Sequence, residues 1–180
     1  RHVGHGRPAI GIAVRRQQAA HVLAESEQKY RILFQTMAQG VVYQSADGKI
    51  ISANPAAERI LGLTLDEMQG RISIDPRWRA IHEDGSDFPG RTHPAMVALQ
   101  TGREVRDVVM GVYNPRTESH VWISVNAVPR IEPGDDKPCQ VYTTLKDITD
   151  RKQAEEATRK AQAELIEQRQ HEKEHAEAEL

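Results

Sequence analysis

One short stretch of the sequence matches a catalytic pattern in residue type and spacing. The segment from His171 to His175 reads HEKEH. On a helix, H-E-x-x-H places two imidazoles on one face, where they bind zinc while the glutamate serves as a general base. Here the surrounding segment is polar on all sides, and the five residues that follow supply no third ligand. We therefore interpret the stretch as a solvated helix face and predict no metal site.

The central histidines and the single cysteine are the other side chains that could bind a cofactor. Cys139 is the only cysteine, so the sequence predicts neither a disulfide framework nor a cysteine-based zinc site. His82 and His93 lie in a stretch rich in turn residues. A histidine before Pro94, at the start of a helix, is most often a structural or exposed residue.

Other catalytic arrangements are not found in the sequence. No nucleophile with a base, carboxylate pair or glycine-rich phosphate loop occurs at a catalytic spacing, so we expect no enzymatic activity in this chain. The net charge of -2 predicts no nucleic-acid partner. No apolar run approaches the ~18–20 residues of a membrane span. With one cysteine, an arginine at the start and no signal peptide, we interpret the chain as a fragment of a longer cytoplasmic protein.

Hydrophobic periodicity and turn residues define the elements that would position these side chains. All eight aromatic residues lie between Tyr30 and Tyr142, so the core is expected in the middle of the chain. The pattern predicts strands over residues 41–44, 49–53, 105–113, 120–128 and 140–148. It predicts helices over 8–37, with a break near Ser26, and over 55–62, 64–70 and 94–100. This order indicates an α+β fold with a five-stranded antiparallel sheet and short helices on one face.

The segment from Thr149 onward is nearly half charged and predicts a long helix that enters no core. Glu155 with Arg159 and Glu156 with Lys160 are favourable pairs four residues apart. A thin heptad-like seam runs through Ala154, Ala157, Ala161 and Leu165. Such a helix needs a partner helix or a continuation to be stable.

Six stretches, in this order and spacing, resemble a PAS domain, the sensory module of many bacterial signalling proteins. They are SEQKYRILFQTMAQGVV, DGKIISANPAAERILG, DEMQG, ALQTG, WISVNAVP and KDITDRKQAE. The resemblance covers about residues 26–152. It implies a partly helical N-terminal extension over 1–25, a PAS domain over 26–148, and a coiled-coil-like signalling helix over 149–180 that leads to a missing output domain.

The resemblance also implies how a signal leaves the domain. In the family, the last strand commonly ends in a segment like Asp147-Ile148-Thr149 and runs directly into the signalling helix, with the aspartate bracing the joint. A flexible turn would absorb strain from the sheet, whereas a direct joint passes it to the helix. The helix would pair with its twin in a homodimer through the terminal helices, and the output domain would be a histidine kinase of a two-component system or a cyclic-di-GMP enzyme.

The resemblance leaves the cofactor open. Family members that bind flavin carry a reactive cysteine between the strands, but residues 70–100 contain none and Cys139 lies at the last strand. Haem-binding members use a histidine there, and we prefer His93 over His82, although its place relative to LQTG does not match the expected haem motif. A small organic ligand, or none, remains. Candidate pocket residues are Trp78, His82, His93, Met96, Met110 and Asn126.

Each of these six residues also has a plain structural interpretation. Trp78 and the methionines would then be core, and Asn126 would face solvent beside Ser124. We therefore consider three functions: a sensory or relay domain, a dimerisation scaffold that binds no ligand, and a haem-based gas sensor.

Overall fold

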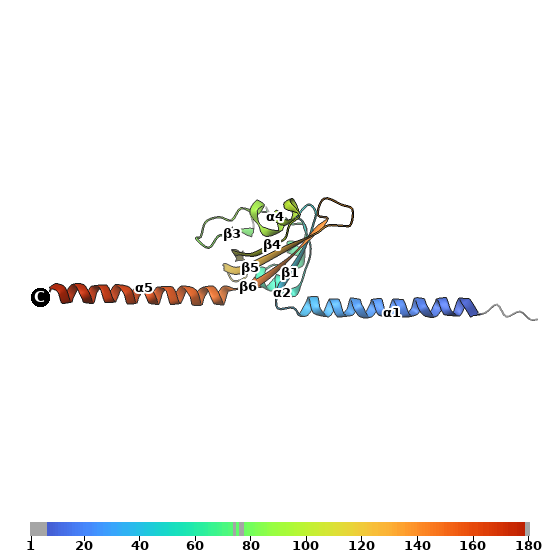
Figure 1. Cartoon of the computed structure of the whole chain (residues 1–180), viewed down its shortest axis with the longest axis horizontal. Helices are drawn as coiled ribbons and strands as arrows, with labels where there is room; N and C mark the ends of the chain where they lie inside the picture. The colour runs from blue at the N-terminus through green and yellow to red at the C-terminus, as the bar shows by residue number, and fades with distance from the viewer. Residues whose placement is uncertain (1–6, 74, 76–77, 179–180) are drawn as a thin grey trace, which may run out of the picture.

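The computed structural model describes residues 7–73, 75 and 78–178. A central domain carries one long helix at each end, and the two helices extend in opposite directions (Figure 1). The elements in chain order are α1 (Arg7–Thr36), β1 (Gly40–Ser45), β2 (Ile50–Ala53), α2 (Pro55–Leu61), α3 (Leu65–Met68), β3 (Ala80–Ile81), the 3-10 helix η2 (Gly90–Thr92), α4 (Pro94–Thr101), β4 (Val105–Asn114), β5 (Ser119–Arg130), β6 (Gln140–Asp147) and α5 (Thr149–Ala178).

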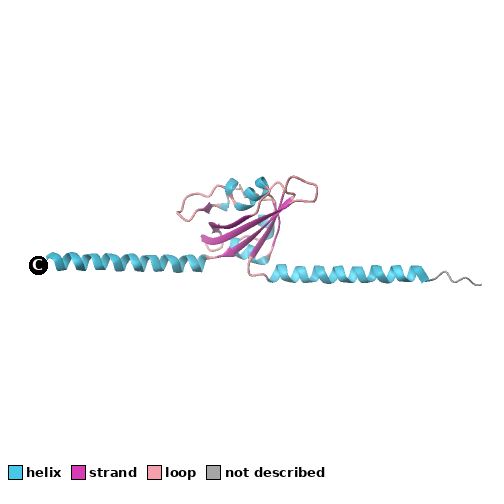
Figure 2. Cartoon of the chain, viewed as in Figure 1, coloured by secondary structure: helices cyan, strands magenta, loops and turns pink. Residues whose placement is uncertain are grey.

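The strands form one antiparallel sheet in the order β2-β1-β6-β5-β4-β3. The predicted α+β fold with short helices on one face is confirmed, and Figure 2 shows the short helices packed beside the curved sheet. The sheet has six strands rather than the expected five. The additional strand is β3, which pairs Ala80 with Val112 and Ile81 with Gly111. Two residues within a turn-rich stretch carry no alternation, so the sequence pattern does not reveal them.

Local side-chain bonds explain where the short helices begin and end. Asn54 is fully buried, and its Oδ1 accepts the backbone N–H groups of Ala57 at 2.9 Å and Val41 at 2.8 Å. It therefore caps α2 and also ties that helix to β1. Thr64 and Glu67 form the reciprocal capping box that starts α3.

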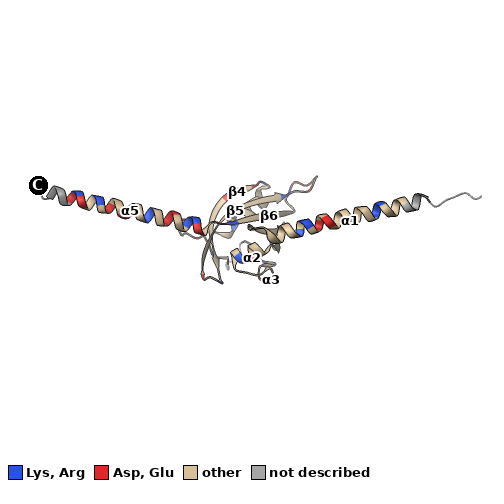
Figure 3. Cartoon of the chain, turned by 90° about the horizontal axis from the view of Figure 1, so that it is seen from below, with Lys and Arg blue, Asp and Glu red and all other residues tan. Residues whose placement is uncertain are grey.

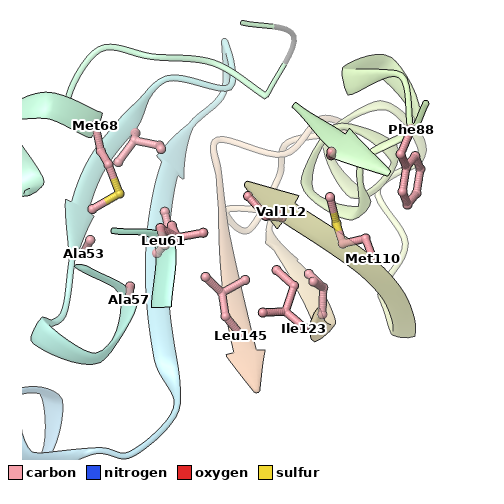
Figure 4. Packing of buried hydrophobic residues seen from close by; sticks show 13 residues of the cluster. Ala53, Ala57, Leu61, Met68, Phe88, Met110, Val112, Ile123 and Leu145 are labelled. Atoms are coloured by element: carbon pink, nitrogen blue, oxygen red, sulfur yellow. The ribbon is translucent and has the colours of Figure 1, made fainter. Parts of the chain in front are cut away.

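The core lies between the sheet and helices α2, α3 and α4. Figure 4 shows Leu61 from α2 and Met68 from α3 on one side, with Ile123 and Leu145 on strands opposite them. Alternation along β5 places Ile123, Val125 and Ala127 on the buried face, as the sequence predicts.

Helix α1 is continuous, so the predicted break near Ser26 is wrong. The segment contains no proline after Pro8, and an ion pair between Lys29 Nζ and Glu25 at 2.9 Å spans the expected break. The last turns of α1 reach the outer face of the sheet. The hydroxyl oxygens of Tyr30 and Tyr43 are 3.1 Å apart, and this hydrogen bond, with burial, raises the pKa of Tyr43 to about 12.

Helix α5 follows β6 without an intervening turn and projects away from the domain. Acidic and basic side chains alternate along it (Figure 3), and Arg151 pairs with Glu155 at 3.1 Å. None of the described helices has the combination of length and apolar character that crossing a membrane requires. In the described residues no cluster of three or more potential ligands could hold a metal ion. The side chain of His175, in the HEKEH stretch, lies outside the described part.

Candidate functional site

A cavity of about 80 Å³ lies between the inner face of the sheet and the covering helices. One water molecule needs roughly 10–15 Å³ of such volume, so the cavity has room for a few waters or a small organic molecule. Most of its described lining is apolar, from strands β1, β2, β4, β5 and β6 and from helices α2 and α4. The polar members are Gln44, Ser73, His93 and Thr143.

Thr143 is the polar group without a protein partner. Its side chain is 5% exposed, and its Oγ1 makes no hydrogen bond within the described structure. The residue lies in the middle of β6, opposite Val42 on β1 and Ala127 on β5. A buried hydroxyl without a partner costs about 1–3 kcal/mol, so this oxygen is available to a ligand or a bound water.

Gln44 is the second polar residue that the sequence analysis missed. Its Nε2 donates to the carbonyl of Gly48 at 2.9 Å and to Ser73 Oγ at 3.4 Å. These bonds hold the β1–β2 turn and the loop after α3 against the cavity. The strand alternation carried the signal for both missed residues, because side chains two residues apart share a face of a strand. Gln44 lies two residues after Val42, and Thr143 lies two residues from both Val141 and Leu145.

His93 lines the cavity and is 8% exposed. Its Nε2 lies 3.1 Å from the carbonyl oxygen of Phe88, which can only accept, so Nε2 carries the proton. Burial lowers the pKa of His93, although the bond to Phe88 opposes that shift. The imidazole is therefore neutral at pH 7, with Nδ1 as its acceptor.

The described residues do not fit a haem. The Nε2 of His93 is already bonded to Phe88, and a cavity of about 80 Å³ is far below the roughly 300–1,000 Å³ of sites for larger ligands. Cys139 does not line the cavity either, because it is exposed and its Sγ donates to the carbonyl of Arg130 at 3.3 Å.

The structure brings Trp78, His93 and Met110 together at the cavity. Trp78 is held there by its indole Nε1, which donates to the Ile72 carbonyl at 3.0 Å. The other predicted pocket residues lie elsewhere. His82 stacks on Phe88 with ring centroids 4.0 Å apart, and Met96 lies under the β1–β2 turn, where its Sδ would contact any Cβ at Gly48.

Asn126 lies on the outer face of the sheet. Its Oδ1 accepts the Asp107 backbone N–H at 2.8 Å, and its Nδ2 donates to Thr144 Oγ1 at 3.4 Å. Asp107 has a φ of 54° within the irregular pairing between β4 and β5. Asn126 therefore stabilises this β-bulge and does not contribute to the cavity.

The predicted signalling joint is held to β5, where Asp147 pairs with Ile123 and the next two residues bond to Trp122. The Ile148 N–H donates to the Trp122 carbonyl at 2.8 Å, and the Trp122 N–H donates to Thr149 Oγ1 at 3.0 Å. Asp147 Oδ1 accepts the Thr149 N–H at 2.9 Å, which satisfies one of the open donors at the start of α5. Ile148 is 5% exposed and anchors the joint in the core. The brace role of Asp147 remains a prediction.

Comparisons with known proteins agree with this architecture. The family model for the PAS fold matches residues 28–148. A curated relative, the sensor histidine kinase TmoS of Ectopseudomonas mendocina, is 26% identical over 152 residues, which cover 84% of this chain but 15% of the relative. The chain thus spans a small part of that relative's length.

Solved structures share the fold at low sequence identity. A sensory box histidine kinase/response regulator from Burkholderia thailandensis has a TM-score of 0.53 at 20% identity, covering 77% of this chain and 98% of that one. The PAS domain of an HTR-like protein from Haloarcula marismortui has a TM-score of 0.52 at 18% identity, covering 73% and 99%. With the family model matched across both the cavity and the strand that leads into the joint, the chain belongs to the PAS family.

Proposed function

We propose that this PAS domain senses a small organic ligand, or relays an upstream signal, and passes the change through α5 to an output domain of the same protein. Similarity to a sensor histidine kinase supports a histidine kinase as the output, with a cyclic-di-GMP enzyme as the alternative. We also infer a cytoplasmic location from the single, exposed cysteine thiol.

The observation that carries this proposal is that one strand, β6, both lines the cavity and leads into the joint with α5. Thr143, with its unpartnered oxygen in the cavity, and Asp147, at the joint, both lie on β6. They are four residues apart, which is about 13 Å along a strand. A ligand that bonds Thr143 therefore acts on the strand that continues directly into α5.

The cavity favours a neutral, compact and largely apolar ligand with one hydrogen-bonding group. No Asp, Glu, Lys or Arg lies among its described lining residues, and His93 is neutral. A charged ligand would lose its hydration without gaining an ion pair, which is costly. Thr143 Oγ1 offers both a donor and an acceptor to the ligand.

We test the ligand by native mass spectrometry of the freshly purified chain, with two variants. Thr143→Val removes the cavity hydroxyl while keeping the side-chain volume. Thr144→Val makes the same change at the next residue, on the opposite face of β6. We expect extra bound mass on the wild type and on Thr144→Val, and its loss from Thr143→Val. Equal retention by all three chains would contradict the role of Thr143.

The second candidate function is a dimerisation scaffold that binds no ligand. It is favoured by the two 30-residue helices, which extend from the domain with exposed apolar side chains such as Leu23, Leu165 and Ile166. Isolated polar helices are marginal in water, so a second copy is the natural partner. A wild-type dimer without extra mass would support this function. A Soret band in the purified protein would instead restore the haem sensor.

A further inference from the structure

The segment from Ala80 to Phe88 forms a tight hairpin, called here hairpin 80–88. The Phe88 N–H donates to the Ala80 carbonyl at 2.8 Å, and the His82 N–H donates to the Ser86 carbonyl at 2.8 Å. At the tip, Asp84 Oδ1 accepts the Ser86 N–H at 2.9 Å. These bonds join the two arms of the hairpin to each other.

The base of hairpin 80–88 contacts the cavity wall. The carbonyl of Phe88 accepts the proton on His93 Nε2 at 3.1 Å. The Phe88 ring packs edge-on against the His93 ring, with centroids 5.2 Å apart, and stacks on His82 at 4.0 Å. The hairpin is thus in direct contact with a residue of the cavity wall.

The other side of hairpin 80–88 contacts α5. Glu83 Oε1 forms an ion pair with Lys152 Nζ, 69 residues along the chain. Lys152 is in the first turn of α5, where its N–H donates to the Ile148 carbonyl at 3.0 Å. Its side chain is 24% exposed, so the pair is partly shielded from solvent.

Lys152 also has a second carboxylate within reach on its own helix. Its Nζ lies 3.7 Å from Glu155 Oε2, while Glu155 Oε1 accepts a bond from Arg151 at 3.1 Å. Lys152 can leave Glu83 without leaving its charge unpaired. Lys152 thus has two alternative acidic partners, and a ligand acts on this contact only if it favours one of the two arrangements.

We propose that hairpin 80–88 is a second coupling element between the cavity and α5, with Glu83 and Lys152 as positioning residues. The bonds to Trp122 hold α5 at one point, and the ion pair holds it at a second point one turn further along. Two contacts along a helix fix the direction of its axis, whereas a single contact allows the axis to rotate about that contact. The control of this contact by a ligand rests on the proposed function, but the contact itself does not.

The test measures the direction of α5 relative to the domain. Nitroxide labels are attached through Asp66→Cys on α3 and Gln162→Cys on α5, outside the seam, in a Cys139→Ser background, and labelled chains are diluted with unlabelled chains. We compare the distance distributions of the parent protein, Glu83→Lys, Lys152→Glu and the double exchange. Glu132→Lys, at an ion pair remote from α5, is the matched control.

We expect each single exchange to shift or broaden the distribution, with the ratio of the two arrangements changing roughly two- to fivefold, as for one partly exposed ion pair. The double exchange should restore it and the control should not change it. An unchanged distribution in both single variants would overturn the proposal. A double variant no better than the singles would also overturn it, provided that all variants melt as the parent does.

The cavity side of the coupling needs its own variant. Phe88→Leu keeps an apolar side chain but removes the ring contacts to His82 and His93. It should broaden the same distribution while leaving Glu83 and Lys152 in place. If Phe88→Leu melts as the parent does and leaves the distance distribution unchanged, the hairpin does not couple the cavity to α5. None of these readouts needs a ligand, so the native mass spectra of the wild type test the proposed function separately.

Discussion

At the scale of single residues, two buried polar groups decide what the cavity can hold. Thr143 offers an oxygen without a protein partner, and His93 presents a neutral imidazole whose proton is committed to Phe88. Both are surrounded by apolar side chains, which strengthens any hydrogen bond that a ligand makes there. The chemistry of the ligand follows from these groups more than from the size of the cavity.

The buried state of His93 predicts a dependence of stability on pH. Burial lowers its pKa below the ordinary 6.5, so below that pH the unfolded chain binds a proton that the folded protein resists. The contribution of His93 is full above about pH 6.5 and is lost as the pH falls below it. We expect the free energy of unfolding in urea, measured from about pH 8 to pH 5, to fall more steeply for the wild type than for His93→Gln.

A matched control for this measurement is His120→Gln, which changes a partly exposed histidine on β5. It should keep the steep pH dependence of the wild type. The same slope in the wild type and His93→Gln would show that another group is responsible.

At the scale of elements, the ends of helices are fixed by contacts between distant segments. Gly62 ends α2 with a φ of 69°, directly against Asn114 at the end of β4. The Nδ2 of Asn114 donates to the carbonyls of Ile60 at 3.1 Å and Arg59 at 3.3 Å. A strand residue thus completes the C-terminus of a helix by binding open carbonyl groups 54 and 55 positions earlier in the chain.

We expect Gly62→Ala to be strongly destabilising, because a Cβ there collides with the Asn114 amide in addition to the strain of a positive φ. Gly70→Ala is the control, since Gly70 has a φ of 77° but nothing within 4 Å of the added Cβ. Urea unfolding should show a loss of about 1 kcal/mol for Gly70→Ala and at least ~1 kcal/mol more for Gly62→Ala. Equal losses would mean that the backbone conformation alone matters.

The joint gives the second prediction at this scale. Asp147→Ala removes the acceptor for the Thr149 N–H, and we expect it to uncouple output in the full-length protein. The isolated domain should lose only about 0.5–1 kcal/mol of stability. Asp150→Ala, in the first turn of the same helix, should leave output unchanged. Normal signalling by Asp147→Ala, measured as the response of the output activity to stimulus, would contradict the brace role.

At the scale of the whole molecule, the proposed homodimer can be tested at the seam of α5. Leu165 is 49% exposed on α5, in the seam predicted from the sequence. We expect Leu165→Lys to raise the dimer dissociation constant at least ~10-fold in analytical ultracentrifugation, because it places a charge in a dry interface. Gln162→Lys adds the same charge outside the seam and should have little effect. Equal weakening by both variants would indicate an effect of net charge rather than of the seam.

The sequence by itself determined most of the elements, though not β3 or the continuity of α1, and it indicated the α+β order and the family. Asp47-Gly48, Asn54-Pro55 and the alternation of β5 are local signals, and local signals suffice because each depends on neighbours within a few residues. The continuous α1 was misjudged because a serine near position 26 suggested a helix start, whereas side-chain pairs along the helix favour continuation.

Only the tertiary structure decided which residues share a site. Thr143, Gln44 and His93 come from segments far apart in the sequence and meet because the sheet order brings β1 beside β6, with α4 above them. The alternation of β5 already turns Asn126 to the outer face, because Val125 and Ala127 are buried, but only the tertiary structure shows that its amide binds the β-bulge at Asp107. The pairing of Glu83 with Lys152 likewise depends on β3 joining the sheet edge, a contact that no local pattern encodes.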